Sequence, residues 1–389
     1  MTASSNAKMP STDTSKIPFY RHDLGEPEVR AFEAALQDPI ITTGKVTADF
    51  EGRFSDYLGT KHALAVTSCT GAMHMALTAL DIGIGDEVIT TPMTFIATAT
   101  AILEAGAKPV FADVEPDTGN IDVECIEAAI TPKTKAILPV HLYGLMVDMR
   151  AVRAVADQHK LAVVEDAAHC VEGSRDGVRP GQLSDAACFS FYATKNLTCG
   201  EGGAIATNKS ALHEQLRLIR LHGMTKTAYD RSEEGYTHWD MVRMGWKYNL
   251  SNLDASILLP QMDRLNANLE KRAERAGLYR SLLAPIKGIA VQGERPDSVN
   301  ARHVFNIWVR SASRDLVIGE LRERGIESVV NYRAIHLHKY FRDTGGYKEG
   351  DFPIAEELGD STLSVPFYPT MPLEHIHTVC SALEEIMPA

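Results

Sequence analysis

The sequence lacks any run of apolar residues that approaches the roughly 18 needed for a membrane-spanning helix. Its first residues, 1–15, are polar, rich in serine and threonine, and have no apolar centre. Such a segment is neither a signal peptide nor a membrane anchor. We therefore expect a soluble, cytoplasmic protein with no membrane partner, which begins with a disordered tail over residues 1–17.

Cysteine is also scarce, and its placement excludes two further classes of protein. No Cys-x-x-Cys pair occurs, and no histidines stand at metal-ligand spacing, which argues against a disulfide framework and a zinc site. We expect buried free thiols in a reducing compartment and no metal ion. The thiols in question are Cys69, Cys125, Cys170, Cys188, Cys199 and Cys380.

Positive charge is in deficit, with 39 basic against 51 acidic residues and a net charge of -12. This balance argues against nucleic acid as a partner, although a local group of donors can still bind a small phosphate-bearing ligand. The 389 residues, 44% of them hydrophobic, are enough for a large domain and a smaller one. We place the large domain at residues 18–260, and a long connecting helix with a small C-terminal domain at residues 261–389.

The middle of the chain alternates short β-branched segments with longer segments rich in alanine and leucine. This alternation predicts an α/β fold, in which a mostly parallel sheet has helices on both faces. The last two strands are joined by a glycine-rich loop too short for a helical crossover, so that end of the sheet is expected to be mixed. The expected strands are 87–91, 109–114, 136–140, 161–166, 187–192 and 203–207, and the expected helices are 70–80, 94–106, 123–130 and 149–159.

The C-terminal part has a different pattern, which predicts a small α+β domain. A helical stretch over 253–283 contains Pro260, which should kink it because proline removes a backbone hydrogen bond. The further expected elements are strands 304–309 and 328–332 and helices 314–324 and 373–386.

Two residues stand where a sheet of this kind places its chemistry. Asp166 ends one apolar strand, and Lys195 follows another, just before a glycine-rich turn. A lysine facing such a crevice can form a Schiff base, and a nearby carboxylate can pair with a pyridinium nitrogen. Alone, each has an ordinary interpretation, as a solvated surface lysine and a helix-capping aspartate. Together they favour a pyridoxal 5'-phosphate (PLP) site.

The same region also has features that suit a phosphate and a planar ring. The small-residue loop 67–72 opens a helix, whose free N–H groups and dipole favour an anion, and Ser190 adds a second hydroxyl. Phe95 could stack on a planar ring, although a core aromatic is its ordinary role. No Gly-x-Gly-x-x-Gly motif follows the first expected strand, which disfavours a plain nucleotide-binding protein.

These segments together resemble the sugar aminotransferases of the DegT/DnrJ/EryC1/StrS family, which have PLP-dependent transferase fold type I. The resemblance covers almost everything from residue 18 onward, and the segments around Asp166 and Lys195 are its most specific part. The motifs are Thr42-Thr-Gly44, Ser68-Cys-Thr-Gly-Ala72, Pro92-Met-Thr-Phe95, Val140-His-Leu-Tyr-Gly144, Glu165-Asp-Ala-Ala-His169, Phe189-Ser-Phe-Tyr-Ala-Thr-Lys195 and Gly245-Trp-Lys-Tyr-Asn249.

The resemblance assigns a role to each matching position. Lys195 matches the Schiff-base lysine and Asp166 the partner of the pyridine nitrogen, both of them catalytic residues. The remaining cofactor contacts are implied at Phe95, which stacks on the ring, at Thr70, Gly71 and Ser190, which bind the phosphate, and at His169, which lies beside the ring hydroxyl.

Further matches concern the partner subunit and the substrate. Asn249 matches a residue that reaches the phosphate of the neighbouring subunit, which implies a homodimer with shared active sites. Tyr332 and His336 lie where members of the family line the sugar pocket. Cys69 replaces a common glycine, Gly71 a common alanine and Asn331 a common histidine, and the last departure bears on the substrate contacts.

The implied reaction moves an amino group from glutamate, leaving 2-oxoglutarate, to a keto sugar. We expect the ketone at C4 of a nucleotide-linked hexose, in amino-sugar or polysaccharide biosynthesis. The alternatives are amination at C3 or of a keto-cyclitol, and a PLP-binding regulatory protein without turnover. A dehydratase branch of the family has histidine in place of the lysine, so Lys195 favours amino transfer.

Overall fold

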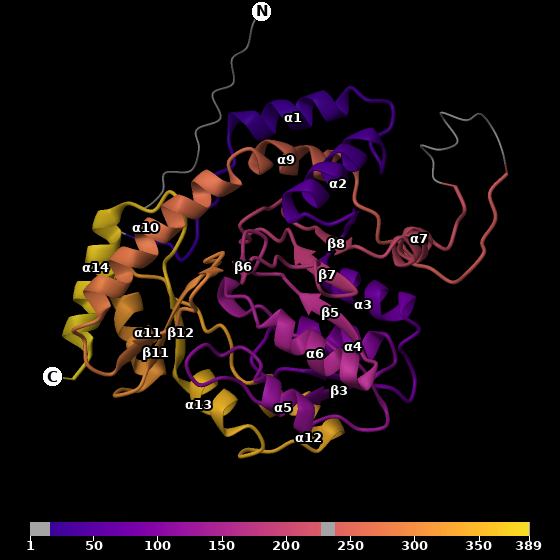
Figure 1. Cartoon of the computed structure of the whole chain (residues 1–389). Helices are drawn as coiled ribbons and strands as arrows, with labels where there is room; N and C mark the ends of the chain where they lie inside the picture. Colours follow the sequence, from indigo (N-terminus) through magenta and orange to yellow (C-terminus); the bar gives the residue numbers. More distant parts are fainter. Residues whose placement is uncertain (1–15, 227–237, 389) are drawn as a thin grey trace, which may run out of the picture.

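The computed structural model describes residues 16–226 and 238–388 (Figure 1). Most of the predicted tail, residues 1–15, lies outside the described part. Ile17, the last residue of that prediction, is buried in the hydrophobic core of the C-terminal part and pairs with Ile326. The packed part of the chain therefore begins before residue 18.

The central sheet has seven strands in the order β1-β8-β7-β5-β4-β2-β3, which confirms the predicted α/β fold. Five neighbouring strands are parallel, and β8 runs antiparallel to both β7 and β1. The expected mixed end is therefore present. The strands are β1 (His62–Val66), β2 (Glu87–Thr90), β3 (Lys108–Phe111), β4 (Thr134–Ile137), β5 (Ala162–Asp166), β7 (Ala186–Ser190) and β8 (Gly203–Thr207).

Helices cover both faces of this sheet because successive strand residues point to opposite sides. In β1, Ala63 and Ala65 belong to one core and Leu64 and Val66 to the other. The first core also includes residues of α2 (Lys45–Leu58), α5 (Val123–Ala128), α6 (Met149–His159) and α9 (Asn252–Met262). The second core includes residues of α3 (Cys69–Ala79), α4 (Ala97–Glu104) and α7 (Ser210–Ile219), while α1 (Glu26–Leu36) packs on α9.

The expected helix over 253–283 is two helices, α9 and α10 (Leu265–Leu283), with the break at Asp263–Arg264. Pro260 lies inside α9, so the break comes after the proline rather than at it. Arg264 stabilises the break, because its guanidinium donates to the Pro260 carbonyl oxygen at 3.2 Å and forms ion pairs with Asp23 and Glu28.

The C-terminal part has its own hydrophobic core beside the large sheet (Figure 1). Its antiparallel sheet has the order β12-β11-β9, with strands β9 (Ile289–Val291), β11 (Phe305–Val309) and β12 (Thr362–Val365). Helices α11 (Arg314–Glu323), α12 (Lys339–Gly345), α13 (Pro353–Ser361) and α14 (Leu373–Ile386) complete this part. The prediction of a strand over 328–332 was wrong, because only Val329 pairs there, as an isolated bridge to Ser364.

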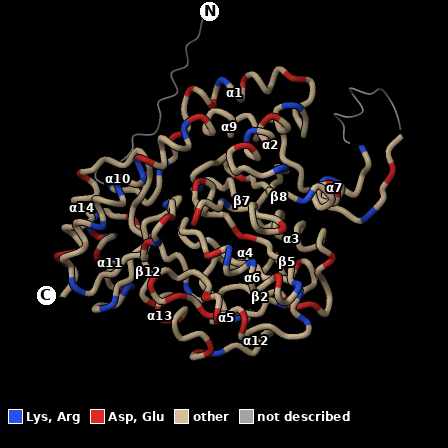
Figure 2. The backbone as a smooth tube through the Cα atoms, in the orientation of Figure 1, with Lys and Arg blue, Asp and Glu red and all other residues tan. Residues whose placement is uncertain are grey.

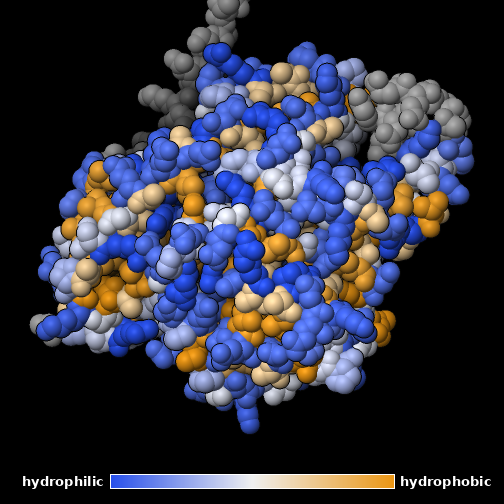
Figure 3. Space-filling model, viewed as in Figure 1, coloured by the Kyte–Doolittle hydropathy of each residue, from blue (hydrophilic) through white to orange (hydrophobic). Residues whose placement is uncertain are grey.

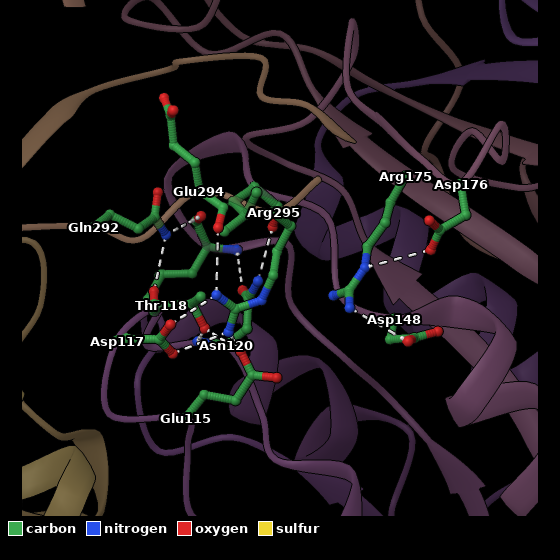
Figure 4. A network of polar contacts seen from close by, with 12 residues as sticks. Glu115, Asp117, Thr118, Asn120, Asp148, Arg175, Asp176, Gln292, Glu294 and Arg295 are labelled. Carbon is green, nitrogen blue, oxygen red and sulfur yellow. Dashed lines mark hydrogen bonds and ion pairs between the residues drawn. The ribbon is translucent and has the colours of Figure 1, made fainter. Parts of the chain in front are cut away.

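A polar network joins the large sheet to the C-terminal part (Figure 4). The Arg295 guanidinium lies 2.8 Å from Glu115 and 2.7 Å from Asp117, two carboxylates in the loop after β3. Gln292 donates its amide to the Thr118 carbonyl oxygen at 2.8 Å and to the Leu142 carbonyl oxygen at 3.1 Å. These contacts hold the segment before β11 against the loops at the carboxyl ends of the parallel strands.

Acidic and basic residues are interspersed along both parts of the chain (Figure 2), and the face in Figure 3 is mostly hydrophilic with small hydrophobic patches. Within the described residues, no helix combines the length and the apolar character needed to cross a membrane.

Gly203, the first residue of β8, has no room for a side chain. An added Cβ would lie 2.6 Å from the Phe189 carbonyl oxygen and 2.7 Å from the Cys69 amide nitrogen, both backbone atoms that cannot turn aside. We expect Gly203→Ala to lower the free energy of unfolding by about 1–3 kcal/mol, measured by urea denaturation. Gly277→Ala is the control, because open space surrounds that position in α10 and alanine should add up to about 1 kcal/mol. Equal effects of the two substitutions would show that the backbone around Gly203 can yield to a side chain.

Candidate active site

Asp166 lies at the carboxyl end of β5, and its side chain is oriented by hydrogen bonds. Thr98 on α4 donates its hydroxyl to Oδ2 at 2.7 Å, and the Ala168 amide donates to Oδ1 at 3.1 Å. The side chain is buried. The Cys69 thiol is a third, weaker donor to Oδ1, at 3.9 Å. A buried carboxylate held by these donors is a fixed negative charge at the edge of the sheet.

Lys195 follows β7, which pairs in parallel with β5, so the lysine comes after the same edge of the sheet at which Asp166 lies. Its Nζ lies 3.3 Å from Nε2 of His303, which comes from the C-terminal part. Burial lowers the pKa of Lys195 to about 8, against smaller opposite effects of nearby Asp166 and Cys69. About a tenth of the amine is therefore uncharged at pH 7, against well under about a thousandth at the ordinary lysine pKa, and the uncharged form is the one that a nucleophile or a proton carrier requires.

His169, in the segment after β5, contacts the C-terminal part through His303, whose ring centroid lies 4.5 Å from its own. Burial first, and then the charge of Lys195, lower the pKa of His169 well below its ordinary value, so the ring is neutral. Its Nδ1 accepts the Tyr143 amide at 3.3 Å, so the ring proton is assigned to Nε2, which lies 3.2 Å from the Tyr332 hydroxyl. The histidine therefore presents a neutral N–H donor to the site.

The N-terminus of α3 forms the expected anion-binding feature. Ser68 caps the helix and accepts the Gly71 amide at 3.0 Å, so this amide is already engaged by a hydroxyl that we did not single out. Ser190 is buried at the end of β7, and its hydroxyl accepts the Tyr192 amide at 3.3 Å. Thr70 is the first-turn hydroxyl beside them, and it is partly exposed.

Phe95 is 55% exposed and Ile96 is 41% exposed, although Thr94 before them and Thr98 after them are buried. Its ring lies 5.8 Å from that of Tyr332 at an angle of 47°. An apolar ring left open beside buried polar groups offers a surface on which another ring can stack.

The two candidate substrate-binding residues, Tyr332 and His336, lie in different surroundings. Tyr332 contacts His169 and Phe95 and so belongs to the group. His336 is fully buried, with Nε2 3.0 Å from a Glu356 carboxylate oxygen and its ring packed on Phe352. This enclosed position argues against direct contact between His336 and a substrate.

Asn249 lies beside Val66, the residue that precedes the loop before α3, and forms a β-bridge with it. Its side-chain Nδ2 donates to the Thr43 hydroxyl at 2.7 Å, and the Lys247 ammonium donates to its side-chain Oδ1. The segments 42–44 and 245–249, quoted above as separate motifs, therefore meet in the fold.

Besides Ser68, three contributors were not expected from the sequence, namely Thr98, Tyr143 and His303. Thr98 is four residues after Thr94, and their hydroxyls lie 2.7 Å apart, so a pair of threonines at this spacing was an available signal. Tyr143 stood inside a quoted motif, but its contribution is a backbone N–H, which any residue carries. No local pattern around His303 indicates that it meets Lys195 from more than 100 residues away.

These groups fit PLP, because each polar part of that cofactor has a chemical counterpart. A buried carboxylate suits the pyridine nitrogen, an amine with a lowered pKa suits the aldehyde, and hydroxyls at a helix N-terminus suit the phosphate. The residues that would hold it are Asp166, Lys195, Thr70, Gly71, Ser190, His169 and Phe95.

A family model matches residues 22–384, and its description is the DegT/DnrJ/EryC1/StrS aminotransferase family. The chain belongs to this family. It is therefore a PLP-dependent sugar aminotransferase with the fold of that group of enzymes.

Two curated relatives cover almost the whole chain. The spore coat polysaccharide biosynthesis protein SpsC of Bacillus subtilis is 39% identical over 377 residues, which are 95% of this chain and 97% of that one. The uncharacterised protein MJ1066 of Methanocaldococcus jannaschii is 37% identical over 378 residues, 96% of this chain and 98% of that one.

Solved structures are similar over the same length. The PLP form of the sugar aminotransferase Spr1654 of Streptococcus pneumoniae has a TM-score of 0.89 at 29% identity, over 96% of this chain and all (100%) of that one. Helicobacter pylori PseC, an aminotransferase involved in the biosynthesis of pseudoaminic acid, has a TM-score of 0.89 at 27% identity, over 96% and 99% of the two chains.

The orientation of Asp166 should have a measurable effect on turnover. Asp166→Asn removes the fixed negative charge, and we expect the rate to fall at least about a hundredfold, or ~2.7 kcal/mol in barrier. Thr98→Val keeps the charge and loses one charge-assisted hydrogen bond, so a loss of about tenfold is expected. Thr100→Val on the same helix is the control, because that hydroxyl only donates to the Ala97 carbonyl oxygen. A Thr98→Val rate equal to that of the control would refute this orienting role.

Proposed function

We propose that this aminotransferase takes its amino group from glutamate and delivers it to a keto sugar, with the ketone at C4 of a nucleotide-linked hexose. The observation that carries the proposal is Lys195, whose pKa burial lowers to about 8, beside the buried carboxylate of Asp166. The names of two relatives support a sugar product, since SpsC is a polysaccharide biosynthesis protein and PseC takes part in pseudoaminic acid biosynthesis.

PLP, when bound, supplies a conjugated ring that accepts the electron pair released as a substrate Cα–H bond breaks. Asp166 would keep a proton on the pyridine nitrogen of the bound cofactor, because a negative charge within hydrogen-bond reach favours the positive form of that nitrogen. Thr98 and the Ala168 amide hold the carboxylate so that this charge is fixed before the reaction begins. His169 would contribute a neutral Nε2–H donor to the same site.

Lys195 moves the proton. With PLP bound, its uncharged amine would take the proton from the Cα of the amino donor and deliver it to C4′ of the cofactor, and the same transfer in reverse would serve the keto sugar. A pKa of about 8 suits both directions near neutral pH, since an amine with the usual lysine pKa would remain protonated.

The proposed position of amination, C4, is argued from the C-terminal segment that holds Tyr332 and His336. The segment Asn331-Tyr-Arg-Ala-Ile-His336 resembles members that aminate C4, and Tyr332 lies at the site while His336 is buried against Glu356. Amination at C3 and amination of a keto-cyclitol are the alternatives for the substrate, and a PLP-binding regulator is the alternative without turnover.

A test in two half-reactions separates these possibilities. Glutamate added to the PLP-loaded protein should convert the cofactor to its amine form, seen as loss of the visible absorbance band, with release of 2-oxoglutarate. A nucleotide-linked 4-keto-hexose should then restore the band, while 3-keto isomers and keto-cyclitols at equal concentration should not. An unchanged spectrum with glutamate would favour the regulator, and restoration by a 3-keto sugar or a cyclitol alone would overturn the C4 assignment.

We also propose a homodimer in which Asn249 completes the phosphate site of the partner subunit. The segment that leads to Asn249 exposes Met241, Val242 and Met244, with 54%, 55% and 62% of each residue exposed. Neighbouring exposed apolar side chains of this kind favour burial against another surface. In a twofold-symmetric dimer each site would borrow one asparagine.

Mixing two inactive variants tests the shared site. In a heterodimer of Lys195→Ala and Asn249→Ala chains, one site receives both lesions and the other neither, so activity should reappear relative to either homodimer. A heterodimer that forms but stays inactive would contradict sharing. If Asn249 only stabilises its own chain through Thr43, its substitution should lower stability by about 0.5–1.5 kcal/mol without changing cofactor affinity.

A further inference from the structure

His303 reaches the site from the C-terminal part, on the segment between β10 (Ser298–Val299) and β11. It is 7% exposed, and its Nε2 lies 3.3 Å from Nζ of Lys195. Its ring centroid lies 4.5 Å from that of His169, with the two rings inclined by 34°. The lysine that we assign to the cofactor therefore has a polar contact outside the large sheet.

Backbone hydrogen bonds hold His303 in this place. Its amide donates to the Tyr143 carbonyl oxygen at 3.0 Å, and the Ala301 amide donates to the Gly144 carbonyl oxygen at 2.9 Å. Asn196, the residue after Lys195, donates its amide to the Ala301 carbonyl oxygen at 2.8 Å. The segments that carry the lysine and the histidine are therefore tied to each other beside the contact itself.

The ring of His303 is neutral. Burial first, and then the charge of Lys195 with smaller electrostatic effects of His169 and Arg272, lower its pKa well below the ordinary value. Arg272 lies 3.5 Å from a Glu172 carboxylate oxygen, and both side chains are buried. The charged and titratable groups around His303 are therefore Lys195, with Asp166 beyond it, His169, and the Arg272–Glu172 pair.

The direction of the hydrogen bond follows from this neutral state. A neutral imidazole has one N–H and one lone pair, and an ammonium group can only donate. Nε2 is therefore the acceptor when Lys195 is charged, which puts the ring proton on Nδ1. Within the described part of the chain Nδ1 has no hydrogen-bond partner, so no donor to Nδ1 holds the ring in the other tautomer, with its proton on Nε2.

We propose that His303 is a positioning residue for Lys195, whose amino group it holds at the site by accepting a hydrogen bond at Nε2. The neutral ring directs the amine without competing for its proton. This inference rests on the proposed role of Lys195 and adds a residue from the C-terminal part to the site.

A hydrogen bond accepted from the ammonium form stabilises the charged state of Lys195. Its loss should lower the titration midpoint of Lys195 by about one pH unit, since a bond to a charged group is of that size. His303→Leu removes the acceptor and retains much of the volume. His303→Gln keeps a neutral acceptor at similar reach, and His303→Asn keeps an amide that is too short.

The measurement is competitive acetylation of the full-length, PLP-free protein with trace acetic anhydride over about pH 6 to 10. Peptide mass spectrometry then gives the titration midpoint of Lys195 directly. His213→Leu is the matched control, because it removes a partly buried imidazole that stacks on His62. We expect a lower midpoint in the Leu and Asn variants, and the parental midpoint in the Gln variant and the control.

An unchanged midpoint in both the Leu and the Asn variants would overturn the proposal, even if both lose thermal stability. A Gln midpoint as low as that of Leu would also overturn it, because the acceptor would then be irrelevant. If the Leu variant does not fold, the comparison of Asn with Gln decides. None of these results depends on whether PLP binds to Lys195, so a failure here is distinguishable from a failure of the proposed function.

Discussion

The backbone of Tyr143 lies where the large sheet, the site and the C-terminal part meet, and it is held in a left-handed conformation with φ +60°. Its N–H donates to His169, its carbonyl oxygen accepts the His303 amide, and its hydroxyl donates to the Asn331 carbonyl oxygen. A non-glycine residue in this conformation costs about 1–3 kcal/mol, which the surrounding contacts must offset. The strained residue Tyr143 thus sets the tautomer of His169 and the position of His303.

The large sheet supplies the other half of the site. Strands β5 and β7 end side by side, which brings Asp166 and the segment of Lys195 to the same edge. Burial determines the protonation of the groups at this edge more than neighbouring charges do, since it is the largest influence on the pKa of Lys195, His169 and His303. An amine that can lose its proton near neutral pH, beside two neutral imidazoles, is the result.

Sequence patterns predicted the parts of this molecule that depend on the periodicity of neighbouring residues. The alternating elements, the mixed end of the sheet and the last helix, 373–386, follow from residue periodicity, and the structure has them. Strand β1 was missed because His-Ala-Leu-Ala-Val, with two alanines, has a weak strand pattern. His303 and Tyr143 act through long-range or backbone contacts, so their side-chain types gave no signal. His336 has the residue type expected of a pocket, yet tertiary packing encloses it.

The proposed reaction and the proposed role of His303 both depend on Lys195 being the residue that holds the cofactor. Reduction of the PLP-loaded protein with borohydride, followed by peptide mapping, measures this directly. We expect a pyridoxyl label on Lys195 in the parent protein and no label in Lys195→Ala, whose fold is retained. A label on any other lysine of the parent, or an undiminished label in Lys195→Ala, would contradict the assignment.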